Sequence, residues 1–461
     1  MPKGTTLFLQ FKLRMRMRRI LERHNPVCIL GAGMTGLAAG LASGFPVFEA
    51  EKTTGGICSS YYMRPRGKKR LQAKPKDEVA YRFEIGGGHW IFGADPLVLR
   101  LIRSISPIKS YSRKASIYLP DQGLLVPYPL QNHLGYLGSK LASKALQEME
   151  RTSPCNNQKV ETMADWLHLN LGPTLCELFF DPFHYLYTAG LCKKIAPQDA
   201  YKSPVDIRLV RQGASAQVPP VGYNATYIYP KGGLDVLARE MAARSEIYYN
   251  HRVESIDLER KEVHFTESRP ISYGRLLSTL PLNRMLQLTG LKTEQKPNPS
   301  PSVLVLNIGA TKGPETPQDH WVYIPKSQAQ FHRVGFYSNV DSSFLPAPDR
   351  TTKNKVSVYV EKAFPQGQKP TEFEIEVLGH AVVKELQDWG WISDVEVLDP
   401  TWIDVAYTWS WPNSKWKEEA LEILDQHNIL QVGRYARWVF QGIADSIRDG
   451  LIAGTTLRVE V

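Results

Sequence analysis

The sequence predicts an α/β fold that combines a parallel sheet, a mainly helical insertion and an antiparallel sheet. The parallel sheet is predicted because an apolar run at residues 27–30 leads directly into a glycine-rich turn and then a helical pattern. The insertion follows from the helical periodicity of residues 134–195. The antiparallel sheet follows from alternating apolar and polar residues in four segments: 302–310, 319–325, 331–338 and 355–361.

The turn Gly31-Ala32-Gly33-Met34-Thr35-Gly36 has the spacing of a dinucleotide-binding turn. Gly31 permits the tight turn, Gly33 lets a pyrophosphate approach the backbone, and Gly36 lets helix and strand pack closely. The next strand ends at Glu49, whose carboxylate is placed to accept hydrogen bonds from adenosine ribose hydroxyls. This order indicates a Rossmann-like domain. A glycine turn of another α/β domain is the alternative, and the turn itself does not distinguish FAD from NAD.

Two further segments favour FAD. Gly55 and Gly56 follow the ribose acid closely, which suits a cofactor that lies extended along the backbone. Near the C-terminus, a strand ends at Gly433 and a helix begins at Asp445. A strand-to-helix turn with an acid at its start suits the sugar-alcohol end of a flavin. We therefore expect a Rossmann-like FAD-binding domain.

Candidate site residues also occur outside these turns. Three glycines at residues 86–88 precede His89 and let the backbone pass close to a flat ligand, although a core histidine is an equal alternative. Prolines on both sides of Tyr128 fix an extended backbone, from which Tyr128 and Gln131 can project into a cleft. The alternative is a tyrosine that only packs. The aromatic cluster 181–187 is expected to be core.

A chain of 461 residues is too long for one core, so two or three subdomains are expected. The antiparallel sheet is expected to form the substrate domain. The predicted parts are a basic N-terminal extension (1–25), an FAD-binding domain (26–105, 225–290 and 425–461), a mainly helical insertion (106–224) and an antiparallel sheet substrate domain (291–424).

The net charge of +10 is concentrated in two short segments. Residues 1–25 carry +6 and residues 64–76 carry +7, which leaves −3 for the rest of the chain. A general nucleic-acid surface is therefore not supported. For the first segment we favour a disordered extension over a targeting or membrane-surface segment. The second is expected to be a solvated hairpin tip, with phosphate binding as the alternative.

The lengths of the apolar runs and the spacing of the cysteines indicate whether a transmembrane helix or a metal site is expected. No run of 18 apolar residues occurs, so no transmembrane helix is expected. The five cysteines show no C-x-x-C spacing, so no metal site is expected. They are expected to be free thiols in a reducing compartment, which favours a cytoplasmic protein.

On these motifs the chain resembles the FAD-containing superfamily of amine oxidases and protoporphyrinogen oxidases. Within it, the chain is most similar to UDP-galactopyranose mutases of the eukaryotic type, over residues 26–457. Besides the glycine turns, Glu49 and the His89 segment, five stretches carry the resemblance: Val126-Pro127-Tyr128-Pro129-Leu130-Gln131-Asn132, the Phe180 to Tyr185 cluster, Asn224-Ala225-Thr226, Trp321-Val322-Tyr323-Ile324-Pro325 and Gly433-Arg434-Tyr435.

The resemblance implies roles for individual residues. It places His89 against the flavin and makes Arg208 one of two arginines that clamp a substrate diphosphate, so these two are the expected catalytic residues. Further implied substrate contacts are Tyr128, Gln131, His184, Asn224 and Tyr323. The implied cofactor contacts are Gly31, Gly33, Gly36, Glu49, Gly55, Gly56, His89, Val253, Gly433, Arg434 and Asp445.

The substrate half departs from the mutase pattern more than the flavin half does. The second arginine is expected near Ile308, where Gly309 stands, with Lys312 nearby. His184 and Thr188 stand where mutases usually carry asparagine and tryptophan, and Trp411 and Phe440 stand in place of tyrosines.

The resemblance implies a mutase that isomerises a nucleotide-linked sugar between pyranose and furanose forms. In such mutases the reduced flavin is the catalyst and there is no net redox change; NAD(P)H is the candidate external reductant. The first alternative is an FAD-dependent oxidoreductase of the same superfamily that oxidises an amine, a sugar or an isoprenoid. A non-enzymatic FAD-binding protein and an NAD dehydrogenase are weaker alternatives.

Overall fold

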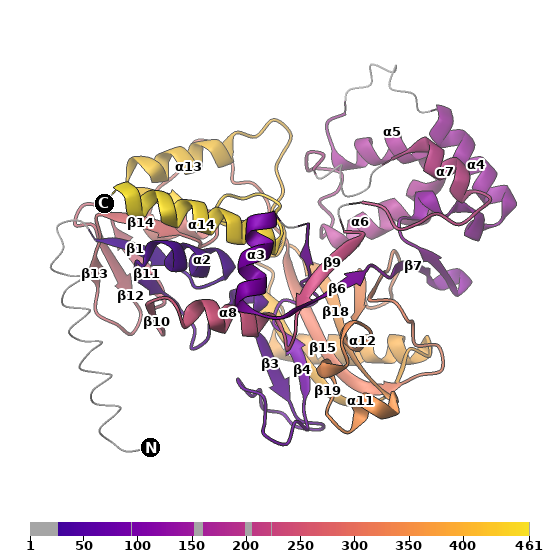
Figure 1. The fold of residues 1–461 in the computed structure, drawn as a ribbon. Helices are drawn as coiled ribbons and strands as arrows, with labels where there is room; N and C mark the ends of the chain where they lie inside the picture. Colours follow the sequence, from indigo (N-terminus) through magenta and orange to yellow (C-terminus); the bar gives the residue numbers. More distant parts are fainter. Residues whose placement is uncertain (1–25, 94, 152–159, 199–204, 223, 461) are drawn as a thin grey trace.

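A computed structural model describes residues 26–460 except 94, 152–159, 199–204 and 223 (Figure 1). The extension predicted at residues 1–25 lies outside this range. Among the helices described, none combines the length and apolar character needed to cross a membrane.

A parallel sheet carries the glycine turn. Its strands in the described chain come from three separate stretches and lie in the order β10 (Ile247–Tyr248), β2 (Val47–Phe48), β1 (Val27–Leu30), β14 (Arg275–Ser278) and β20 (Ile429–Gln431). Helix α2 (Met34–Ser43) follows β1, and α14 (Ile443–Glu460) packs against α2 (Figure 1). An added Cβ at Gly450 would lie 2.2 Å from the Thr35 carbonyl oxygen, so only glycine allows this helix contact.

A larger, mainly antiparallel sheet forms the second layer of the fold. In the described residues its strand order is β19 (Ile392–Ile403), β15 (Ser302–Lys312), β18 (Lys355–Phe364), β17 (Arg333–Phe336), β16 (Trp321–Tyr323), β7 (Ala115–Leu119) and β8 (Leu124–Pro127). Only the β16–β7 pair is parallel among these. The four strands predicted by alternation correspond to β15, β16, β17 and β18.

Two parts of this sheet were not predicted. Strand β19 contains Pro400, and a proline within a segment speaks against predicting a strand from the sequence. Because β19 lies at the edge of the sheet, the N–H that proline lacks is not needed there. Strands β7 and β8 fall within residues 106–224, which were predicted to be mainly helical. The helical region therefore begins after Pro127, and the other domain boundaries stay a prediction.

The described chain also forms three smaller sheets. They pair β3 (Ser60–Met63) with β4 (Tyr81–Glu84), β9 (Thr226–Pro230) with β5 (Ile91–Phe92) and β6 (Ile108–Ser112), and β12 (Glu262–Phe265) with β11 (Val253–Asp257) and β13 (Ile271–Ser272). The basic segment 64–76 joins β3 to β4, so the predicted hairpin is confirmed. Its charge is partly neutralised, because Arg70 lies 2.6 Å from Asp399 and stacks over Tyr61.

The remaining helices surround the sheets. They are α3 (Pro96–Ile105), α4 (Ser139–Arg151), α5 (Met163–Leu175), α6 (Asp181–Tyr187), α7 (Ile207–Gly213), α8 (Leu234–Ala242), α9 (Leu282–Thr289), α10 (Tyr337–Val340), α11 (Asp349–Thr352), α12 (Glu372–Asp388) and α13 (Trp416–Gln426). Helices α4 to α7 form a group beside the sheets (Figure 1). Their core includes Leu167, Leu171 and Phe179, and it also takes in Ile117 and Val126 of β7 and β8.

Candidate active site

One cavity of about 680 Å³ runs from the start of α2 to the antiparallel sheet. Its lining comes from the segments that follow strands of the parallel sheet, from the antiparallel sheet, from α6 and from the start of α14. Eleven of the residues predicted from the sequence lie along it: Gly33, Gly55, Gly56, His89, Tyr128, His184, Asn224, Tyr323, Gly433, Arg434 and Asp445. A single cavity therefore joins these predicted cofactor contacts to the predicted substrate contacts.

The glycine turn leaves room for a phosphate group. Gly31 has φ +94°, and an added Cβ at Gly36 would lie 1.9 Å from the Gly31 carbonyl oxygen, so both positions require glycine. At Gly33 no described atom lies within 4 Å of an added Cβ. In the described structure no side chain caps the start of α2. The N–H groups of this helix end therefore face open space that a pyrophosphate fits.

Glu49 is held rigidly at the end of β2. Its Oε2 accepts a hydrogen bond from the Ala32 N–H at 2.7 Å, and its Oε1 accepts one from the Glu51 N–H at 2.8 Å. Burial raises the pKa of this carboxyl. Each oxygen keeps a second lone pair, so the ribose contact stays a prediction.

The C-terminal end of the cavity also has polar groups for a cofactor. Gly433 has φ +93°, and an added Cβ would lie 2.5 Å from Thr35 Oγ1. Arg434 Nη1 donates to the Gln441 carbonyl oxygen at 3.0 Å, whereas its buried Nε has no partner among the described residues. Asp445 accepts from the Gly442 N–H at 3.1 Å. An unpaired buried donor beside the cavity fits a bound polar group.

His89 also lines the cavity. Burial lowers the pKa of its imidazole to about 4, so the ring is neutral at physiological pH. The glycines before it are pressed against strand β18, because an added Cβ at Gly88 would lie 2.1 Å from the Tyr359 hydroxyl. Tyr359 also excludes a side chain at Gly335, where an added Cβ would lie 1.9 Å from its ring.

Four predicted substrate residues meet in the cavity: Tyr128, His184, Asn224 and Tyr323. The Tyr128 and Tyr323 ring centres are 5.0 Å apart. Arg113, which was not predicted, is buried behind two of these residues. Its Nη1 donates to Asn224 Oδ1 and its Nη2 donates to the Tyr128 carbonyl oxygen at 3.1 Å. Arg113 therefore fixes Tyr128 relative to Asn224.

The structure does not bring every predicted residue to the cavity. Arg208 lies on α7 with its side chain 85% exposed, and its Nη2 lies 2.9 Å from Asp206 Oδ2. Gln131 is buried and does not line the cavity, and Val253 lies on β11. The roles of these three residues stay predictions.

Arg333 lines the cavity but was not predicted as a site residue. It lies on β17 directly opposite Glu361 of β18, and its Nη2 donates to both Glu361 carboxylate oxygens. Burial opposes ionisation of Glu361, but the guanidinium and His332 lower its pKa to about 2. Tyr407 donates a third hydrogen bond to Glu361 at 3.1 Å.

Strand β15 carries no arginine near Ile308, the position at which the resemblance implies a second one. Ile308 is buried in the middle of β15, and an added Cβ at Gly309 would lie 2.7 Å from the Tyr81 ring. Lys312, at the end of β15, does not line the cavity. Around Ile308, β15 therefore brings no cation to the cavity, whereas Arg333 of β17 lines it.

The fold and the cavity define a flavoenzyme of the FAD-binding type. The family model for flavin containing amine oxidoreductases matches residues 37–371, and the chain belongs to this family. It is therefore an FAD-dependent enzyme, and the glycine turn before α2 and the residues around Arg434 fit that cofactor. These comparisons confirm the predicted superfamily and cofactor.

Solved structures with the same fold include three with different activities. A reduced UDP-galactopyranose mutase matches with a TM-score of 0.80 at 18% identity, over 95% of this chain and 95% of that chain. A CLA-producing fatty acid isomerase from P. acnes matches with a TM-score of 0.59 at 15% identity, over 94% and 98%. A putrescine oxidase bound to putrescine matches with a TM-score of 0.54 at 15% identity, over 94% and 99%. At these identities the likeness concerns the fold.

Proposed function

We propose that this flavoenzyme acts on a nucleotide-linked sugar as a UDP-galactopyranose mutase-like isomerase. The observation that carries the proposal is the shared cavity of His89, Tyr128, Asn224 and Arg333. The mutase structure supports it, because that match is better in TM-score than those to the fatty acid isomerase and the putrescine oxidase. FAD, when bound and reduced, would supply the redox-neutral chemistry of sugar-ring isomerisation.

The protein residues would bind and orient such a substrate. Tyr128 and Tyr323 present two rings at 5.0 Å, a distance suited to packing against a nucleobase. Asn224 supplies an amide whose oxygen is already occupied by Arg113, which leaves its N–H groups to donate. The neutral His89 ring offers a flat surface and a hydrogen-bonding nitrogen without adding charge.

Binding of a diphosphate would need more positive charge than the lining supplies. Among the described lining residues, Arg333 and Arg434 are balanced by Glu361 and Asp445. We propose that Arg208 supplies the additional cation. Its ion pair with Asp206 is exposed and screened by solvent, so exchange of Asp206 for a phosphate has a small cost.

An FAD-dependent oxidoreductase is the second candidate. It is favoured by the aromatic wall that faces His184, which includes Phe179, Phe180, Phe183 and Tyr187. Such a wall suits an apolar or amine substrate.

A cytoplasmic location also stays a proposal, supported by four described cysteines that are free and buried.

A spectral screen distinguishes the two candidates. The purified holoenzyme is titrated with nucleotides, UDP-sugars and amines while the flavin spectrum is recorded in the oxidised and reduced states. We expect UDP-sugars to perturb the spectrum, and prereduced enzyme to interconvert UDP-galactopyranose and UDP-galactofuranose while its flavin stays reduced. The oxidised enzyme is the control. Bleaching of oxidised flavin by an amine or sugar, with no isomerised product, would overturn the proposal in favour of the oxidoreductase.

A further inference from the structure

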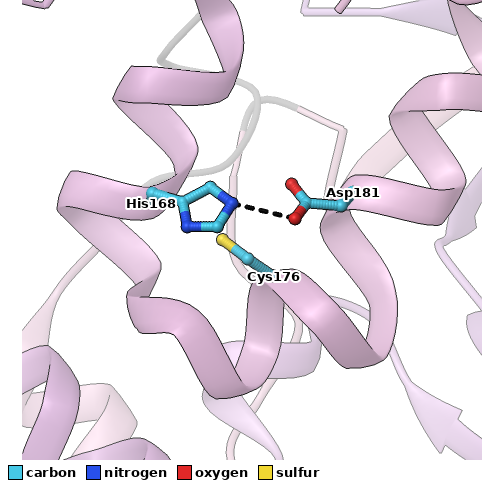
Figure 2. Close-up of side chains that lie close together, drawn as sticks. All are labelled: His168, Cys176 and Asp181. Carbon is cyan, nitrogen blue, oxygen red and sulfur yellow. Dashed lines mark hydrogen bonds and ion pairs between the residues drawn. The ribbon is translucent and has the colours of Figure 1, made fainter. Parts of the chain in front are cut away.

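The connection between α5 and α6 brings three metal-ligating side chains together. Gly172 interrupts α5 with φ +74° and is followed by Pro173, and the chain then forms a π-helical turn at Cys176–Phe180. This path folds His168 of α5, Cys176 of the π turn and Asp181 of α6 toward one point (Figure 2). π turns of this kind occur frequently at functional sites.

The three donor atoms form a compact group. His168 Nε2 lies 2.8 Å from Asp181 Oδ2, and all three donor atoms lie within 4.8 Å of one another. Figure 2 shows the Cys176 sulfur next to the His168 imidazole, with the Asp181 carboxylate across the hydrogen bond from the ring. Cys176 is fully buried, whereas the His168 and Asp181 side chains are 49% and 35% exposed. The group is therefore closed on the protein side and open to solvent on the other.

This donor set has the chemistry of a zinc-class cation. Zn²⁺ binds imidazole nitrogen, thiolate sulfur and carboxylate oxygen in a tetrahedral arrangement, whereas Mg²⁺ and Ca²⁺ prefer oxygen alone. Tetrahedral ligands place nitrogen and oxygen about 3.3 Å apart, so the pair at 2.8 Å needs to open by only about half an ångström. A simple His–Asp hydrogen bond would not require a thiol next to the imidazole.

We propose that His168, Cys176 and Asp181 bind a zinc-class divalent cation, with water as the fourth ligand. The site is distinct from the flavin cavity, and the cysteine spacing had predicted no metal. It would have a structural role, because it joins α5 to α6. Residues that follow Cys176 and Asp181, among them Phe180 and His184, line the cavity. A bound cation would hold this wall in place.

Metal analysis of the full-length holoenzyme tests the proposal. The enzyme is stripped with a chelator, titrated with Zn²⁺ against a chromophoric competitor, and assayed by mass spectrometry for retained metal. We expect stoichiometric Zn²⁺ in the wild type, and more than a ~100-fold loss of affinity in His168→Ala and Cys176→Ser. His380→Ala removes a histidine that is 72% exposed on α12 and is the matched control, with unchanged affinity.

Thermal unfolding gives a second measurement that does not depend on catalysis. Zn²⁺ should raise the Tm of the wild type and of His380→Ala in a concentration-dependent way, because it binds only the folded state. It should leave the Tm of His168→Ala unchanged while FAD content stays stoichiometric. Since His168 is half exposed, this variant is expected to fold even if Cys176→Ser does not. A wild type that retains no Zn²⁺, or a His168→Ala variant with wild-type affinity, would overturn the proposal.

Discussion

The two ends of the cavity differ in whether backbone or side-chain groups form them. The FAD end is formed mainly by backbone: the turn at Gly31–Gly36 and the uncapped start of α2 lie within a short stretch of chain. The other end is formed by long side chains from distant segments, such as Tyr128, Arg333 and Glu361. Backbone sites are specified by local sequence, whereas side-chain sites depend on how distant strands pair. Variants at the two ends should therefore have separable effects.

The largest effect is expected from Gly33→Val. Gly33 has an ordinary φ of −70°, so the backbone tolerates valine, but the new side chain would occupy the open space before α2. We expect a folded protein without bound FAD. Flavin absorbance measures the cofactor, and far-UV circular dichroism is the control for folding. Stoichiometric FAD in this variant would show that the pyrophosphate does not approach Gly33.

The next largest effect is expected from Arg333→Ala. It leaves the buried Glu361 carboxylate without its main partner, which should lower the free energy of unfolding by about 3–5 kcal/mol. UDP-sugar affinity should fall, while FAD binding should be retained. Urea unfolding and flavin titration measure these quantities.

A double variant separates the two roles of Arg333. Arg333→Met with Glu361→Gln removes both charges, so stability should recover while UDP-sugar affinity stays low. Recovery of affinity together with stability would limit Arg333 to a structural role.

A smaller effect is expected from Arg208→Ala. Loss of a charge-assisted contact should weaken UDP-sugar binding by about tenfold without changing FAD content or stability. Spectral titration of the reduced enzyme measures this affinity. Unchanged affinity would mean that Arg208 stays bound to Asp206, as in this structure, and has no part in the site.

The smallest effect is expected from Tyr323→Phe. The ring contact with Tyr128 is kept and one neutral hydroxyl is lost, so UDP-sugar affinity should fall by about fivefold. Tyr185→Phe, at a residue that is 65% exposed, is the matched control and should change nothing. Equal affinities for both variants would show that the Tyr323 hydroxyl does not contact the ligand.

Sequence reasoning succeeded where the signal is local. The turn around Gly33 and the strands β15 and β18 follow from spacing and alternation, and the fold class was predicted from them. FAD was predicted from the glycine pair at residues 55–56 and from the segment between Gly433 and Asp445. Sequence reasoning missed Arg333 because a lone arginine in a strand has no distinguishing spacing. The pairing with Glu361 becomes evident only once β17 and β18 are in register. It also placed Arg208 in the site from resemblance, whereas the structure puts that side chain on the surface.

The position of Tyr359 limits the order in which amino-acid substitutions can be tolerated around it. Its side chain fills the space that a Cβ at either Gly88 or Gly335 would need, so three positions in separate segments share one volume. A larger residue at either glycine is tolerated only after Tyr359 has become smaller. Laboratory evolution toward new substrates should therefore reach this part of the wall through ordered pairs of substitutions, with the change at Tyr359 first.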